Sequence, residues 1–448
     1  MKNETIAENV SETNNLNTLD YSQRLNKVIP GGAHTYSRGD DQFPQNAPQI
    51  LSKGKGCYVW SNTGEKYLDY GMALRAVNLG YAYDEVDEAA ISQIRVGNNL
   101  TRASLIELQA AEALVNLVPS VEMVKFAKNG SSVTSAAVKL ARAYTGKKKI
   151  ARCLQHPFFS YDDWFIGDTI LKRGIPDETS SMTVNFNYND IKSLESLFNQ
   201  YPNQIAAVIL EPATHEEPKD NFLQKIRELC TQHHAVFILD EMITGFRWHL
   251  KGAQTYYQVQ PDLTTFGKAM ANGFSVAALG GLRDIMNLGG ITSLGQERVF
   301  LMSSTHGAEM SSLGAFVKTL EVCQRESVVE HLWSYGKKLI QGANAISKDL
   351  GILDYFKFDG PGCSPIYLTK DRQGQISFVY RTLFSQEMLK HGVMMPWVAL
   401  SYSHREIELE QTLDAIRKSL TVYKQALETK AENYLEGPAI KPVFRQFN

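Results

Sequence analysis

Cysteine is scarce in this sequence, and so is any imbalance of charge. The five cysteines among 448 residues are scattered, and no two have the CxxC spacing of a metal-binding or redox motif. They argue against a disulfide framework or a metal site and predict reduced thiols in a cytoplasmic protein. The formal net charge is only −2, from 46 basic and 48 acidic residues. Nucleic-acid-binding proteins usually carry a basic excess, so we expect no nucleic-acid partner.

Long apolar runs are also missing. No stretch reaches the roughly 18–20 apolar residues of a membrane helix, and the chain does not open with a basic segment followed by an apolar one. We therefore expect neither a membrane anchor nor a signal peptide. Residues 1–20 contain few apolar side chains and many Asn, Glu, Ser and Thr. They cannot supply a core, and we expect a mobile arm.

The remaining chain is rich enough in apolar residues, 43% overall, to bury a large core. Its length predicts two or three packed units. Residues 21–84 are expected to form an N-terminal segment, in which Tyr58–Trp60 and Tyr67–Tyr70 flank a turn and predict a β-hairpin. Residues 329–448 are expected to form a C-terminal α+β domain.

Between these segments, residues 85–328 alternate short apolar strands with helices. Continuous apolar runs predict buried strands at 123–127, 205–210 and 235–239. Apolar residues at helical spacing follow the first strand and recur over 222–233. Buried strands separated by helices predict an α/β fold, with a mainly parallel sheet flanked by helices.

The loop Asn129-Gly130-Ser131-Ser132 separates the first of these strands from its helix. Free N–H groups at a helix N-terminus bind anions, and Gly130 allows a phosphate to approach the backbone. The loop lacks the GxxxxGK[ST] and GxGxxG patterns of nucleotide sites. A plain helix cap with a capping serine is the alternative.

Two acidic residues end the other buried strands. Asp240 follows 235–239, and Glu211 follows 205–210. Ligands of open α/β sheets bind outside the carboxyl ends of the strands. A carboxylate there can keep a pyridine nitrogen protonated, so that the ring accepts electrons. A structural Asp that caps the next segment is the alternative.

Lys268 lies between glycine and small residues in Phe266–Gly273. A lysine buried beside a sheet has a lowered pKa and becomes a nucleophile for Schiff-base formation. A lone lysine is usually solvated. The order of an anion loop, a strand-end acid and then this lysine favours the functional interpretation.

These motifs resemble those of a known family. Asp240–Arg247 and Pro261–Lys268 are similar to the corresponding segments of the class III aminotransferases. Leu140–Gly146, Pro30–Gly32 and the hairpin are similar to the glutamate-1-semialdehyde 2,1-aminomutase branch. The resemblance covers about residues 22 to 425, and it implies the fold of pyridoxal 5'-phosphate (PLP) enzymes of fold-type I.

The resemblance also implies roles for matching residues. Lys268 would hold PLP covalently and shuttle protons, and Asp240 would pair with the ring nitrogen. Met242 would lie against one face of the ring. Gly130 and Ser131, together with Asn129, would hold the phosphate.

Two further roles follow from the resemblance. Thr305 would reach the phosphate of the partner subunit's cofactor, which implies a homodimer. Arg38 occupies the position at which the aminomutase binds a substrate carboxylate. A surface ion pair with Asp40 or Asp41 is the alternative for Arg38.

The sequence departs from the family at several positions. Ser132 follows Ser131 where Glu is usual, and Ala308–Met310 replaces Gly-Asn-Pro. The usual Tyr-His-Gly becomes a segment with Phe158 and Phe159, either of which could stack on the cofactor or pack in the core. These changes put the aminomutase substrate in doubt.

We therefore expect an aminotransferase that moves an amino group from a donor amine, such as an amino acid, to an anionic keto or aldehyde acceptor. A sugar phosphate or a nucleotide-linked keto sugar would fit that description. The aminomutase reaction is one alternative, and a non-catalytic binding protein on the same fold is another. Retention of both Lys268 and Asp240 argues against the latter.

Overall fold

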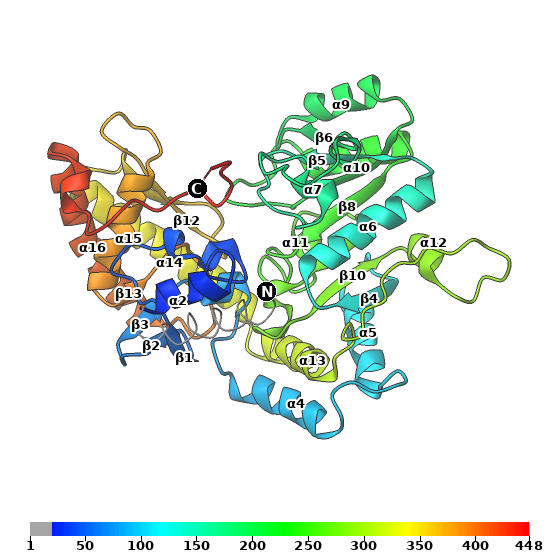
Figure 1. Ribbon diagram of the computed structural model, residues 1–448, viewed down its shortest axis with the longest axis horizontal. Helices are drawn as coiled ribbons and strands as arrows, with labels where there is room; N and C mark the ends of the chain where they lie inside the picture. The colour runs from blue at the N-terminus through cyan, green and yellow to red at the C-terminus, as the bar shows by residue number, and fades with distance from the viewer. Residues whose placement is uncertain (1–19, 448) are drawn as a thin grey trace, which may run out of the picture.

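The computed structural model describes residues 20–447, and it has a larger α/β part and a smaller part that contains both ends of the described chain (Figure 1). The expected mobile arm, residues 1–20, lies outside the described residues except for residue 20. Of these residues, no helix combines the length and the apolar character needed to cross a bilayer. All five cysteines are buried and free of disulfide bonds.

The larger part is built on a seven-stranded sheet of order β4-β10-β9-β8-β7-β5-β6. Only β10 runs against the others: it pairs antiparallel with both β4 and β9, while β9, β8, β7, β5 and β6 pair in parallel. The sheet is therefore mainly parallel, as the sequence predicts. Its strands are β4 (Met123–Ala127), β5 (Lys149–Cys153), β6 (Thr183–Phe186), β7 (Ile205–Leu210), β8 (Val236–Glu241), β9 (Leu263–Phe266) and β10 (Ala277–Gly281).

The central strands are buried on both faces because their side chains alternate between two cores. Val236 and Ile238 of β8 face the core that contains helix α6, whereas Phe237 and Leu239 face the core that contains α9 and α10. The helices of this part are α4 (Asp84–Arg95), α5 (Leu105–Leu117), α6 (Gly130–Thr145), α7 (Asp163–Ile166), α8 (Asp177–Ser180), α9 (Ile191–Gln200), α10 (Phe222–Gln232), α11 (Ala253–Tyr256), α12 (Arg283–Met286) and α13 (Met310–Arg325).

The smaller part joins the two ends of the chain in one sheet of order β1-β2-β3-β13. The short strand β13 lies parallel to β3, with Val393 opposite Leu68. The buried Tyr70 hydroxyl adds bonds to Tyr335 (2.6 Å) and Thr412 (2.7 Å) of the C-terminal helices. The elements are α2 (Tyr21–Val28), β1 (Leu51–Lys55), β2 (Tyr58–Ser61), β3 (Lys66–Asp69), α14 (Val328–Asp349), β11 (Phe356–Asp359), β12 (Ile366–Thr369), α15 (Phe378–Lys390), β13 (Val393–Met394) and α16 (Glu406–Glu428).

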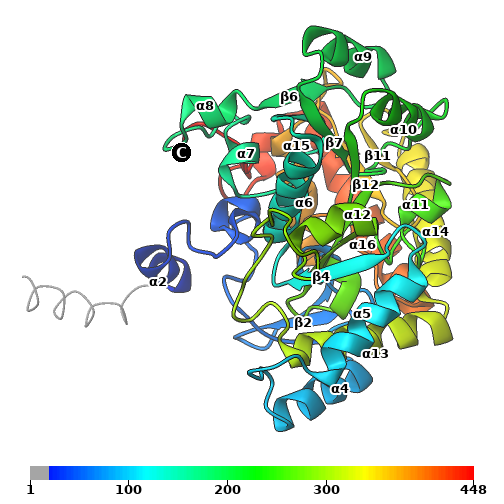
Figure 2. The ribbon, with the colours of Figure 1, turned by 90° about the vertical axis from the view of Figure 1, so that its right-hand side faces the viewer.

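Several predicted elements are present. The hairpin is β2 and β3, and the strands expected at 123–127 and 205–210 are β4 and β7. Two expectations need correction. The strand expected at 235–239 continues to Glu241, so Asp240 lies inside it, and α6 begins at Gly130 rather than after Ser132. Figure 2, a view rotated by 90° from Figure 1, shows α6 lying across the sheet near β4, β7 and α12.

Candidate active site

Asp240 lies next to last in β8 and is buried. Its Oδ1 accepts hydrogen bonds from the backbone N–H of Met242 (2.9 Å) and from Oγ1 of Thr265 (3.1 Å), its neighbour on β9. Burial raises the pKa of the Asp240 carboxyl to about 6, although these hydrogen bonds and the charge of Lys268 lower it. Within residues 20–447, Oδ2 has no hydrogen-bond donor. This oxygen is therefore available to a cationic group of a ligand.

Lys268 follows β9 at the start of the short 3-10 helix η4 (Lys268–Ala271). Its backbone lies in the left-handed region, with φ of 42°, which is uncommon outside glycine and occurs often at functional sites. Desolvation lowers the pKa of the Lys268 amine, and the charge of Arg75 adds to this effect, while Glu211 and Asp240 oppose it. A lowered pKa leaves more of the amine neutral and nucleophilic.

The side chain of Met242 connects three of the predicted motifs. A Cβ on Gly130 would lie 2.9 Å from Met242 Sδ, and a Cβ on Gly267 would lie 2.6 Å from the same atom. Neither position accepts a side chain unless Met242 moves. The end of β8, the start of α6 and the residue before Lys268 therefore meet around one thioether.

The first turn of α6 offers free hydrogen-bond donors. Asn129 caps the helix, because its Oδ1 accepts from the backbone N–H of Ser132 (2.9 Å). The N–H groups of Gly130 and Ser131 have no acceptor in the described part of the chain. Ser131 Oγ accepts from the N–H of Tyr161 (3.1 Å), so its own O–H can donate to a ligand. The turn is thus a helix cap that leaves N–H and O–H donors free, as a phosphate site requires.

Phe158 and Phe159, in the segment that differs from the Tyr-His-Gly of the family, lie in different surroundings. Phe159 is 2% exposed and belongs to the core around α6, where its carbonyl accepts from Thr134 Oγ1 (2.8 Å). Phe158 is 47% exposed and meets Phe165 edge to face. Of the two, Phe158 has the ring surface that a ligand can contact.

Glu211 directly follows β7, and its backbone N–H donates to Nδ1 of His156 (2.9 Å). Burial raises the pKa of the Glu211 carboxyl, Asp240 adds to the rise, and Lys268 and Arg75 oppose it. The pKa of His156 is lowered to about 3 by burial, so its ring is neutral and accepts this bond. The carboxyl groups of Glu211 and Asp240 therefore interact with the cationic side chains of Lys268 and Arg75.

Arg75 is the residue of this group that sequence reasoning missed. It ends α3 (Met72–Arg75), a turn in which four successive non-glycine residues have φ between 39° and 67°. A left-handed conformation costs such residues on the order of 1 kcal/mol or more each, so the surrounding structure must hold the turn. The sequence feature that could have identified Arg75 is its charge, which stands alone in the otherwise apolar run Met72–Val77.

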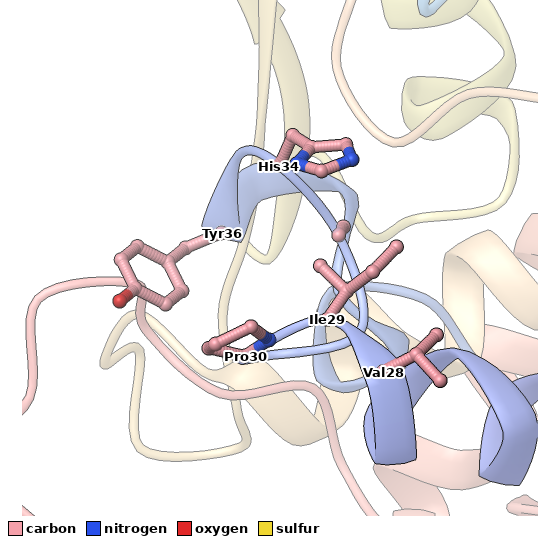
Figure 3. A pocket seen from close by; sticks show the side chains of 6 residues that line it. Val28, Ile29, Pro30, His34 and Tyr36 are labelled. Carbon is pink, nitrogen blue, oxygen red and sulfur yellow. The ribbon is translucent and has the colours of Figure 1, made fainter.

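The remaining predicted residues lie elsewhere in the monomer. Thr305 is exposed, and its carbonyl accepts from Asn99 Nδ2 (3.0 Å). Arg38 is exposed in a pocket of about 850 Å³ formed by the N- and C-terminal segments, which it shares with Ala73 and Leu74 of α3. A second pocket of about 300 Å³ at residues 28–36 contains none of the predicted cofactor residues (Figure 3).

No ion pair of Arg38 is present among residues 20–447, although two acids follow it closely. Asp41 pairs with Arg445 at 2.5 Å, and Asp40 accepts from Ser22 and Asn26. The alternative of a surface ion pair therefore lacks support.

The residues fit PLP. A lysine amine, a buried carboxylate with one free oxygen and free donors at a helix N-terminus match an aldehyde, a pyridine nitrogen and a phosphate. No group of three or more His, Cys, Asp or Glu side chains in the described residues is arranged to hold a metal ion.

Comparison with known proteins gives the same answer. The family model "Aminotransferase class-III" matches residues 41–354. The chain is 31% identical to the 3-aminobutyryl-CoA aminotransferase of Cloacimonas acidaminovorans over 92% of this chain and 98% of the relative. It is also 31% identical to the glutamate-1-semialdehyde 2,1-aminomutase of Nitrosospira multiformis, over 88% and 97%. The PLP-containing structure of the Sphingopyxis sp. MTA144 FumI protein superposes with a TM-score of 0.83 at 27% identity, covering 92% of this chain and 97% of that one.

The raised pKa of Asp240 predicts that its charge destabilises the cofactor-free fold. Because the pKa in the folded state, about 6, exceeds the ordinary 3.8, the Asp240 charge destabilises the fold above pH 6, and this contribution is lost as the pH falls from 6 toward 4. Asp240→Asn removes the charge but keeps an acceptor for Met242 N–H. We expect urea denaturation at pH 8 to show the cofactor-free variant more stable than wild type by about 1–3 kcal/mol, with a smaller difference at pH 5. A less stable variant at pH 8 would contradict this account.

Proposed function

The chain belongs to the class III aminotransferases, and from this membership we propose that it transfers an amino group from an amino-acid donor to an anionic keto or aldehyde acceptor. Its fold is that of the fold-type I PLP enzymes, and PLP is its cofactor. The observation that supports amino transfer most directly is the position of Lys268 and Asp240 at the ends of neighbouring strands, beside the free N–H groups of α6.

We assign the central roles to these two residues. PLP, when bound, supplies a ring that accepts electrons from the substrate carbon. Lys268 would hold the cofactor through its ε-amino group and, once displaced by the substrate amine, would move a proton from the substrate carbon to the former aldehyde carbon of the cofactor. Asp240 keeps the ring nitrogen protonated, because its free Oδ2 provides a negative charge in a buried site. The lowered pKa of Lys268 suits the amine to both tasks.

The surrounding residues bind and orient the cofactor in this proposal. Gly130, Ser131 and the capping Asn129 hold the phosphate at the start of α6. Met242 lies against one face of the ring, and Phe158 covers the other. Phe158 is chosen over Phe159 because the latter is enclosed in the core.

Lys268 is expected to carry the cofactor covalently. Borohydride reduction of the PLP-loaded protein, followed by peptide mapping, should place the pyridoxyl group on Lys268, and Lys268→Ala should lose the label. The exposed Lys139 in α6 provides a control variant, Lys139→Ala, that should be labelled like wild type. A label on another lysine would refute the assignment.

The anionic acceptor rests on the position of Arg38. Its guanidinium is exposed in the pocket of about 850 Å³ and has no ion pair in the described residues, so it can bind a carboxylate or a phosphate. The Cloacimonas relative, by its name, acts on a CoA derivative, which also carries phosphates. A sugar phosphate or nucleotide-linked keto sugar remains our preferred acceptor class. The aminomutase reaction is the alternative, and the changed segment Ala308–Met310 argues against it.

Supplying glutamate-1-semialdehyde and measuring 5-aminolevulinate separates the two reactions. We expect little product from it, but consumption of the amino donor when a phosphorylated or nucleotide-linked ketone is added. Arg38→Ala should then raise KM for that acceptor about tenfold or more, and raise KM less for an uncharged analogue. Rapid formation of 5-aminolevulinate would overturn the proposal.

We further propose a homodimer in which Thr305 serves the partner's cofactor. Thr305 is exposed in the monomer, where its side chain has no hydrogen bond within residues 20–447. Such a residue is free to complete a site across an interface.

Mixing two inactive variants tests this arrangement. Chains with Lys268→Ala and chains with Thr305→Ala are unfolded, refolded together and assayed. If Thr305 acts in the partner's site, each mixed dimer contains one site with both residues intact, so activity should recover above that of either variant alone. If it acts within its own chain, no mixed dimer has an intact site, and recovery should be absent.

A further inference from the structure

The turn that ends in Arg75 is held from several directions. The Asp69 carboxylate accepts from the N–H groups of Gly71 (2.7 Å) and Met72 (2.9 Å). The hydroxyl of Tyr81 accepts from the N–H of Ala73 (2.8 Å) and donates to Asp69 (2.7 Å). These bonds fix the left-handed backbone of α3, and hence the direction in which its last side chain leaves.

The carbonyl side of the turn is fixed as well. The buried Arg247 donates to the carbonyl of Arg75 (3.3 Å) and to Asn78 Oδ1 (2.5 Å), and Trp397 Nε1 donates to the carbonyl of Gly71 (2.9 Å). A strained turn with this many restraints indicates that the conformation serves a purpose.

The guanidinium of Arg75 has no hydrogen bond or ion pair within residues 20–447, and its Nε is buried without a partner. Arg75 as a whole is half-buried, and guanidinium groups withdrawn from water are normally paired, because desolvation of an isolated charge is costly. The nearest acid by its electrostatic effect is Glu211, and Arg381 of α15 acts on Arg75 as a like charge. α3, which ends in Arg75, packs against η4, which begins with Lys268, and Arg75 acts on Lys268 as a like charge. The free donors therefore lie on the side of the turn that adjoins Lys268.

Glu211 is a poor counterion for this guanidinium. It makes no salt bridge with Arg75 in the described residues, and burial together with the nearby Asp240 raises its pKa, so that its negative charge is reduced near neutral pH. The cation is thus left with donors that an incoming anion can use.

We propose that Arg75 is a specificity-determining residue that binds the carboxylate of the amino-acid substrate next to the reacting carbon. This inference rests on the proposed aminotransferase function and adds a contact to it. The two N–H donors on one edge of a guanidinium match the two oxygens of a carboxylate. Arg381 adds positive charge to the same region. Its guanidinium already donates a hydrogen bond to the carbonyl of Pro396 (2.6 Å), so we assign the carboxylate to Arg75.

A carboxylate fits this position better than a phosphate. A dianion costs more to desolvate beside Asp240 and Glu211 than a monoanion does. Arg38, which is exposed in the outer pocket, is the better partner for a phosphate because water still reaches it. Arg75 thus binds the carboxylate of the donor, and Arg38 binds the phosphate of the acceptor.

Matched amines test the carboxylate contact. L-alanine and isopropylamine differ only by a carboxylate in place of a methyl group, as do 3-aminobutanoate and 2-aminobutane. Each amine is mixed with the PLP-loaded enzyme without acceptor, and the conversion of cofactor is followed by its absorption. Arg75→Gln should raise the half-saturating concentration of a carboxylate-bearing amine about 30-fold or more and that of its neutral partner less than about threefold.

Two further variants define the effect. Arg75→Lys keeps the charge but loses the paired donors, so it should give an increase of about tenfold. If Arg75→Gln fails to fold, Arg75→Lys alone tests whether the paired donors bind the carboxylate. Arg372→Gln removes an exposed arginine whose contact is with the carbonyl of Thr429, and it should behave as wild type. Equal effects of Arg75 variants on charged and neutral amines would overturn the proposal.

A binding measurement separates this inference from the proposed function. Calorimetric titration of the PLP-loaded protein with propanoate, butanoate or inorganic phosphate needs no turnover. Binding of the carboxylates that Arg75→Gln weakens about 30-fold or more supports Arg75 even if no amine reacts, in which case only the proposed function fails. Binding of phosphate but not of carboxylates, or carboxylate binding that ignores the substitution, refutes the role of Arg75.

Discussion

The pairing of β8 with β9 is the constraint on which the site depends. It places Asp240 opposite Thr265, and η4 begins three residues later with Lys268. In a parallel sheet both strands end at the same edge, so an acid and an amine far apart in sequence come to lie together. Their mutual attraction only partly offsets the desolvation of either charge. Part of the desolvation cost of the Asp240 carboxylate is therefore not compensated within the site. A cationic ring nitrogen beside this carboxylate compensates it.

Much of this arrangement could be predicted from the sequence because its signals are local. An apolar run that leads into Asp240, a lysine after a glycine and a Gly-Ser pair at the start of a helix each carry their chemistry within a few residues. The class of sheet followed from β7, whose residues are all apolar, and from the apolar run Val236–Leu239 of β8. The family resemblance then fixed the cofactor, and the comparisons confirm it.

What could not be predicted depends on contacts between distant segments. Apart from Leu279, the antiparallel β10 consists of alanine and glycine, which have weak strand preference, and its place between β4 and β9 is decided by the sheet. Arg75 lies near Lys268 only because Asp69, Tyr81 and Arg247 fold α3 into a left-handed turn. The charge of Arg75 within an apolar run is visible in the sequence, but the left-handed turn and the missing partner are not. Likewise, the choice between Phe158 and Phe159 required their burial to be known.

The parallel contact between β3 and β13 also orders the assembly of the chain. As the polypeptide leaves the ribosome, all seven strands of the larger sheet are available once β10 has emerged, so that sheet can form early. Strands β1, β2 and β3 appear first of all, yet their sheet lacks its fourth member until β13 is made near the end of synthesis. The edge of β3 must meanwhile stay unpaired, and such an edge is open to pairing with other chains. Truncation of the last hundred residues would thus leave a complete larger sheet attached to an aggregation-prone edge strand.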